Sequence, residues 1–235
     1  MCASYQLLLP SADIAKIFKA KAPKKILWDP SKSERVKISN LVPVIALNPE
    51  TGDREIRMMN WALPRFDIRT KKYLRFQVFN ARDENVNKYS MFKSHFQKDR
   101  ILVPASPAFI EWKDEGRKPN PMYQIGLKGW KPFAFAGFWG TYNINTEGEK
   151  EIAKKREKNP GYQPPKKEVD CFTFVTTTPN SVVEPIHHTR MPVILDPKNY
   201  DAWLDPNMEP DGLVSLLKPY PAEKMQARPA PKGMK

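Results

Sequence analysis

Proline is the feature that most restricts how this chain can fold, because 24 of its 235 residues are proline and only 10 are glycine. Proline lacks a main-chain donor and interrupts both helices and central strands. The chain therefore favours short strands and rigid turns over long helices. Its apolar fraction of 40% and its charged fraction of 28% are those of a globular protein, so extensive disorder is not expected.

Short segments rich in β-branched and aromatic residues predict strands, each bounded by proline, glycine or asparagine. They are residues 42–47, 75–79, 101–104, 122–127, 133–139, 171–177 and 193–195. Helical spacing of apolar residues predicts one helix capped by Ser11 and ending near Ala20, a second capped by Asp83, and a third over 199–204. Strand and helix do not alternate regularly. The pattern predicts a single α+β domain, built mainly on antiparallel sheet with a few short helices.

Charge divides the chain into three parts. Thirty-nine lysines and arginines against 26 acids give a formal net charge of +13. Residues 218–235 form a basic, proline-rich tail of charge +4, which leaves +9 on residues 1–217, the predicted domain. Residues 146–170 are highly charged with few apolar side chains, so we expect a solvated loop insertion without a function of its own. The excess of cations favours a polyanionic partner, nucleic acid first and acidic lipid second.

Several classes of protein are excluded by what the sequence lacks. It has no run of about 18 apolar residues and no apolar leader, so we expect no membrane partner and a cytoplasmic location. Two cysteines, Cys2 and Cys171, cannot form a disulfide framework, and with three histidines they show no zinc-ligand spacing. We therefore expect no metal and no cofactor, and an inert, buried Cys171.

Cys2 carries the most distinctive chemistry. Met1 before a small residue is a good substrate for removal, which would leave Cys2 with its thiol and amine on adjacent carbons. An α-amine has a pKa of about 7.7–8.0 and is partly neutral at physiological pH. It can form an imine with an aldehyde, which the thiol can close to a thiazolidine. A cysteine at position 2 can equally be a small buried residue.

Three further motifs combine polar side chains with strand ends. Asn80 and Arg82 follow a predicted strand, Glu111 stands between apolar neighbours, and His187 and His188 precede Arg190 and another strand. Each has a plain alternative as a turn or surface residue. In order and spacing, together with Asn40-Leu41-Val42-Pro43, Trp61-Ala62-Leu63-Pro64, Ala136-Gly137-Phe138-Trp139 and Thr176-Thr177-Thr178-Pro179-Asn180, they resemble the SOS-response-associated peptidase (SRAP) family. Its members covalently capture abasic sites in single-stranded DNA.

The resemblance covers residues 2 to about 217 and implies a role for each matching residue. Cys2 would be the crosslinking nucleophile, Asn80 would bond the terminal residue, and Glu111 would be the general acid/base. His188 would transfer protons, with His187 as the second choice. Arg82 and Arg190 would hold phosphates, and Pro43, Trp61 and Trp112 would pack against bases or sugars, although both tryptophans could instead be core residues.

The implied function is an abasic-site sensor that forms a thiazolidine crosslink with single-stranded DNA. We expect a monomer that is associated with the nucleoid when bound to DNA. Two alternatives remain open: a thiol peptidase or autoprotease, and a non-covalent binder of single-stranded DNA. The sequence also departs from the family, since Cys2-Ala3-Ser4 replaces the common Cys-Gly-Arg and removes one expected phosphate contact.

Overall fold

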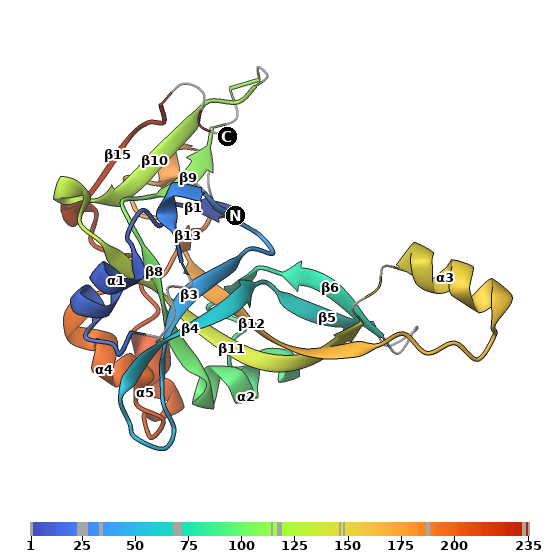
Figure 1. The fold of residues 1–235 in the computed structure, drawn as a ribbon. Coiled ribbons are helices and arrows are strands. Elements are labelled where there is room, and N and C mark those ends of the chain that lie inside the picture. The colour runs from blue at the N-terminus through green and yellow to red at the C-terminus, as the bar shows by residue number, and fades with distance from the viewer. Residues whose placement is uncertain are drawn as a thin grey trace.

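The computed structural model describes residues 2–22, 28–32, 35–67, 72–113, 115–116, 119–145, 147, 149–186, 189–231 and 234. In this part of the chain, most of the secondary structure is antiparallel sheet, with a few short helices at its edges (Figure 1). The predicted α+β class is confirmed. The predicted proton-transfer residue His188 and its alternative His187 lie outside the described residues.

The larger sheet closes on itself like a small barrel. Its closed path runs through β12 (Lys166–Thr177), β4 (Arg54–Trp61), β3 (Leu41–Leu47), β8 (Arg100–Ala105) and β11 (Phe133–Asn145), and β11 pairs with β12 again. Three short strands attach to this path: β7 (Asn80–Arg82), β13 (Met191–Pro192) and β14 (Ile194–Leu195). The pairs of β12 with β4 and with β7 are parallel, and the other pairs are antiparallel.

A second sheet of five strands holds the N-terminal residues. Its order is β15 (Met225–Pro229), β10 (Met122–Leu127), β9 (Phe109–Trp112), β1 (Ser4–Tyr5) and β2 (Val36–Lys37). This sheet lies above the barrel in Figure 1, near the label N. Strands β5 (Leu63–Asp67) and β6 (Lys72–Val78) form a separate hairpin.

The helices lie outside the sheets. They are α1 (Ser11–Phe18), α2 (Ser90–Lys98), α3 (Glu149–Lys158), α4 (Tyr200–Leu204) and α5 (Pro210–Ser215), and short 3-10 turns occur at Pro30–Lys32, Lys128–Trp130, Glu184–Ile186, Pro197–Asn199 and Ala222–Lys224. Helices α2, α4 and α5 lie along one side of the barrel, whereas α3 projects away from the body beyond the hairpin (Figure 1). None of the helices in the described ranges is long and apolar enough to cross a membrane.

An aromatic cluster fills the space beneath β1. The Tyr5 ring lies 5.4 Å from Trp61 and 5.6 Å from Phe135, and Phe174 stacks on both of those rings at 5.1 and 4.8 Å. All four side chains are fully buried. Aromatic pairs at these distances stabilise a core beyond their burial of area. The cluster therefore fixes β1, and with it the position of Cys2, against the barrel.

The strands predicted from sequence form, except that the one predicted over 193–195 is shortened to β14, with Val193 between β13 and β14, and two others are much longer than expected. Strand β11 continues to Asn145 and β12 begins at Lys166. The helix predicted from Ser11 forms, but Pro10 takes the N-cap position and Ser11 is its first helical residue. The prediction of Asp83 as a cap is wrong: α2 begins only at Ser90, because the Asp83 carboxylate bonds Arg190 and Thr177 instead.

The prediction of a solvated loop over 146–170 is also wrong. Residues Glu149–Lys158 form α3, and Ile152 is buried. Charged contacts replace an apolar face here, since the Lys155 ammonium lies 2.7 Å from the Glu147 carboxylate and 3.1 Å from that of Glu151. The pair of Glu151 and Lys155, spaced by four residues, supports an exposed helix.

The proposed boundary after residue 217 needs correction. Met225–Pro229 form β15, which pairs with β10 over five residues, so this part of the expected tail belongs to the second sheet. Arg228 fixes it further: its guanidinium donates to Gln124 at 2.7 Å and lies 4.2 Å from the Trp130 ring centre. Basic and proline-rich composition does not prevent an edge strand.

Candidate functional site

Cys2 lies buried at the edge of the second sheet, with 1% of its surface exposed. Its thiol donates a hydrogen bond of 3.4 Å to the carbonyl oxygen of Ser4. Burial raises the pKa of the Cys2 thiol well above its usual value, and the carboxylate of Glu111 raises the pKa further through its charge. The thiol is therefore held in its protonated form at neutral pH.

Glu111 reaches Cys2 because of how β1 and β9 pair. Ser4 lies opposite Ile110, so the next residue of β9 comes alongside the start of β1. The Glu111 side chain is 1% exposed and hydrogen-bonds the Cys2 thiol. A carboxyl group shielded from water beside a thiol can accept or donate a proton there.

Asn80 contacts Cys2 from the other sheet. Strand β7 runs parallel to β12, with Asn80 opposite Phe174, and this pairing holds the asparagine at the top of the barrel. Its side-chain amide donates to the carbonyl oxygen of Cys2 at 2.8 Å. Its side-chain oxygen is buried and has no hydrogen-bond partner among the described residues. Asn80 thus has one acceptor position open beside Cys2.

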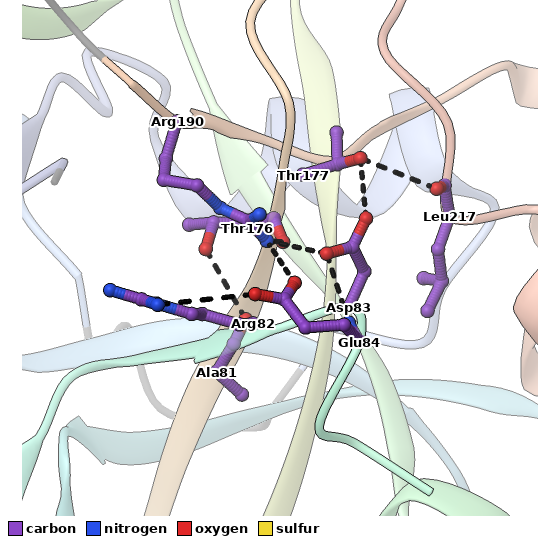
Figure 2. Close-up of polar contacts among 8 residues, drawn as sticks. All are labelled: Ala81, Arg82, Asp83, Glu84, Thr176, Thr177, Arg190 and Leu217. Carbon is purple, nitrogen blue, oxygen red and sulfur yellow. Dashed lines mark hydrogen bonds and ion pairs between the residues drawn. The ribbon is translucent and has the colours of Figure 1, made fainter.

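Arg190 is held by acidic residues that follow directly on Arg82. Figure 2 shows its guanidinium pointing at the carboxylates of Asp83 and Glu84, at 2.5 and 2.9 Å, and at the Thr176 carbonyl oxygen. Burial acts to raise the pKa of Asp83, but hydrogen bonds with Glu84, Thr177 and Arg190, together with the arginine charge, outweigh it and lower the pKa. This cluster ties the segment after β7 to β12 and β13.

The Thr177 hydroxyl completes the cluster. It donates to Asp83 at 2.6 Å and lies 3.5 Å from the carbonyl oxygen of Leu217, at the end of the α5 segment (Figure 2). Sequence reasoning missed Asp83 and Glu84 as partners of Arg190, because their position before an apolar repeat is typical of a helix start. Two acids directly after Arg82 were the signal that could have identified them.

Of the residues expected to contact nucleic acid, the structure exposes two. Arg82 is exposed and lies 4.0 Å from Glu84, and Trp112 is 48% exposed. Trp61 is fully buried and donates to the carbonyl oxygen of Phe79 at 2.8 Å, so the prediction of base contact for Trp61 is corrected to a core role. Pro43 is likewise buried in β3, and its expected packing against bases is corrected as well.

The site therefore brings together three of the four expected reactive residues, Cys2, Asn80 and Glu111, from three distant parts of the chain. Cys171 is fully buried in β12. Among the described residues, no group of three or more histidine, cysteine, aspartate or glutamate side chains is placed to hold a metal ion.

Comparisons with known proteins agree with this fold. A model of the family "SOS response associated peptidase (SRAP)" matches residues 1–235. Abasic site processing protein YoqW of Bacillus subtilis is 37% identical over 153 residues, which are 65% of this chain and 59% of YoqW. Abasic site processing protein YoaM of the same species is 30% identical over 185 residues, which are 78% of this chain and 72% of YoaM. The chain thus spans under two thirds of YoqW's length.

Two crystal structures share the fold at low sequence identity. A protein from Bacteroides thetaiotaomicron superposes with a TM-score of 0.76 at 23% identity, covering 98% of this chain and 93% of that one. A protein from Bordetella bronchiseptica superposes with a TM-score of 0.70 at 20% identity, covering 98% of this chain and all of the other. Both likenesses extend over both sheets.

Proposed function

This chain belongs to the SOS response associated peptidase (SRAP) family, and on that premise we propose that it captures abasic sites in single-stranded DNA. The names of its relatives YoqW and YoaM, both abasic site processing proteins, support this proposal. After removal of Met1, Cys2 would crosslink to the open-ring sugar of the lesion.

One observation carries the proposal: the position of Cys2 between an amide and a carboxylate. Asn80 donates to its carbonyl oxygen at 2.8 Å, and the buried Glu111 contacts its thiol. Once Met1 is removed, the α-amine of Cys2 lies on the same residue as that carbonyl. The open side-chain oxygen of Asn80 is suited to accept a hydrogen bond from such an amine.

The reaction balances without a cofactor. The closed sugar of an abasic site opens to an aldehyde at C1′, which the Cys2 amine attacks. Loss of one water gives an imine, the thiol sulfur adds to the imine carbon, and the thiol proton ends on nitrogen. The product is a five-membered thiazolidine, and the total mass falls by one water.

Glu111 fits the proton transfers that this sequence needs. Its carboxyl group would protonate the departing oxygen and take the thiol proton during ring closure. The pKa of the Cys2 thiol is raised, so the thiol needs such a base when it adds to the imine. His188 stays a proposed second proton donor on motif spacing alone.

The exposed residues around Cys2 are suited to hold the strand. Arg82 is exposed two residues after Asn80, and Trp112 directly follows Glu111. A phosphate would bind the arginine and a base or sugar would stack on the indole, a contact that tolerates any sequence. For Arg190 we propose a phosphate contact only at the rim of its acidic cluster, since its guanidinium is 12% exposed.

Peptidase activity on other proteins has less support. A thiol peptidase needs a thiolate. A thiolate forms in electropositive surroundings, beside a base whose own charge does not repel it. Cys2 is buried next to a carboxylate that disfavours its thiolate. The environment of Cys2 instead favours a thiol that stays protonated until it adds to an imine and gives its proton to Glu111.

A denaturing gel and a measurement of intact mass together test the proposal. The purified protein is mixed with a single strand containing one abasic site, and its intact mass is measured before and after. We expect Met1 to be absent and the protein to gain the mass of the strand minus one water. Cys2→Ala should give no adduct that survives denaturation, although borohydride should trap its imine. A parent protein that binds the strand but forms no such adduct would leave the non-covalent alternative.

A further inference from the structure

Strand β2 presents a lysine next to the residues that lead to Cys2. Lys37 pairs with Ser4, and Ser4 pairs on its other side with Ile110. Residues directly opposite one another in an antiparallel pair project from the same face of the sheet. Lys37, Ser4 and Ile110 therefore share one face, and Trp112, two residues beyond Ile110, is on that face too.

We call this face the outer one, because Lys37 and Trp112 are exposed on it, although Ile110 between them is buried. Tyr5 and its two cross-strand partners, Val36 and Phe109, are all buried on the barrel side. On the opposite face, Lys37 is exposed, Ser4 is partly exposed and Trp112 is 48% exposed. A cation and an indole thus lie on one face of the sheet whose strand β1 begins two residues after Cys2.

Two hydrogen bonds fix the backbone that carries Lys37. Its main-chain N–H donates to the side-chain oxygen of Asn40 at 2.8 Å, and the N–H of Asn40 donates back to the carbonyl of Lys37 at 3.0 Å. The N–H of Ser39, within the turn, donates to the carbonyl of Trp61 at 2.8 Å. Lys37 is therefore presented from a turn anchored to the core.

Lys37 also differs from other cations in its ion pairs. Arg82 lies 4.0 Å from Glu84, Lys113 lies 3.9 Å from Glu115, and Arg190 is held by two acids. None of the ion pairs between described residues involves Lys37. An exposed ammonium without a carboxylate partner is the form in which lysine binds phosphate most readily, as a point charge.

We propose that Lys37 is a phosphate-binding residue for the single strand, positioned on the outer face of the second sheet beside Cys2. With Trp112 on the same face, it would guide the sugar-phosphate backbone past the thiol. The proposal deepens the proposed function and rests on it for the nature of the strand. Lys37 is the cation in this row of residues that pairs directly with β1, whereas Arg228, in the same row, lies on β15 and donates to Gln124.

The salt dependence of binding tests this role. Each phosphate contact adds about 0.7 to the slope of log affinity against log salt for a single strand. The slope is measured by fluorescence anisotropy, with a labelled single strand that has no abasic site, for the parent, Lys37→Gln and Lys37→Arg. Lys158→Gln is the matched control, because it removes an exposed lysine from α3, far from β1 in Figure 1.

We expect Lys37→Gln to lower the slope by about 0.7 and to weaken binding several-fold at low salt. Lys37→Arg should keep the parent slope, and so should Lys158→Gln. An unchanged slope in Lys37→Gln, or an equal loss in Lys158→Gln, would overturn the proposal. The strand without a lesion needs no adduct, so a parent that never crosslinks refutes the proposed function separately, while the slopes still report on Lys37.

Discussion

The side-chain amide of Asn80 donates a 2.8 Å hydrogen bond to the carbonyl oxygen of Cys2, across 78 residues of sequence. This bond joins the two sheets at the proposed nucleophile. The barrel holds Asn80 through the pairing of β7 with β12, and the second sheet holds Cys2 through the pairing of β1 with β9. The distance between amine and substrate therefore depends on how the sheets are joined.

Asn80→Asp should slow adduct formation by about 10- to 100-fold, the size of effect that a small misplacement of reacting groups causes. The substitution replaces a donor by an acceptor, which repels the Cys2 carbonyl. The measurement is a single-turnover time course on an abasic strand at saturating protein.

Asn180→Asp is the matched control for Asn80. Asn180 makes the same kind of bond, from its amide to the carbonyl oxygen of Tyr220 at 2.7 Å. It should lower stability in the same manner and leave the rate of adduct formation near that of the parent. Equal rates in Asn80→Asp and Asn180→Asp would contradict the assigned role of Asn80.

Glu111→Gln should change two properties of Cys2 in opposite directions. The neutral amide removes the negative charge that raises the pKa of the thiol, so the pKa falls and iodoacetamide should alkylate Cys2 faster. Adduct formation should become about 100-fold slower, because the acid/base is lost. In the parent, burial and Glu111 raise the pKa of the thiol well above its usual value, so alkylation should keep rising at alkaline pH, and in Glu111→Gln the rise should begin at lower pH.

Alkylation of Cys171 in the same samples is the internal control. Cys171 is fully buried in β12, and its rate should not change unless the whole fold loosens. If alkylation of Cys2 slows in Glu111→Gln, the carboxylate does not act on the thiol as described.

The family resemblance pointed to Cys2, Asn80 and Glu111, and the structure brings these three residues together. The sequence could not predict that Asp83 and Glu84 hold Arg190, since these residues are 107 and 106 positions apart and meet only through the parallel pairing of β7 with β12. The short-range pattern around Asp83 instead resembled a helix cap.

The two tryptophans show the same limit. Trp61 and Trp112 both stand at the end of a short strand, and sequence alone left core and surface roles open for each. The structure buries Trp61 in the barrel core, at the end of β4 in the closed sheet, whereas Trp112, at the end of β9 in the second sheet, is 48% exposed. The face of a sheet on which a side chain lies depends on the register of the strands. Pairing between residues far apart in sequence sets that register.

Alanine substitution should therefore separate the two tryptophans. Trp61→Ala should lower the free energy of unfolding by about 3–5 kcal/mol, as expected for a large cavity in a core. Trp112→Ala should change it by less than about 0.5 kcal/mol but weaken single-strand binding by about 1–3 kcal/mol. Urea unfolding and anisotropy titrations measure the two quantities. Comparable loss of stability in both variants would contradict the outer position of Trp112.

Asp83 should make the free energy of unfolding depend on pH in the acid range. Its pKa is lowered in the folded state, so its contribution to stability is full above the unfolded-state pKa of about 3.9 and is lost as the pH falls through the lower folded-state pKa.

At pH 7, Asp83→Asn should cost about 2 kcal/mol, since Arg190 and Thr177 lose a charged partner. Glu84→Gln, at a more exposed carboxylate, should cost under about 1 kcal/mol. Urea unfolding at pH 2 to 7 should show the stabilities of the parent and Asp83→Asn converging below about pH 3.9, because protonation removes from the parent the same charge that the substitution removes at every pH. A constant difference across that range would show that the Asp83 carboxylate does not carry the stabilising charge.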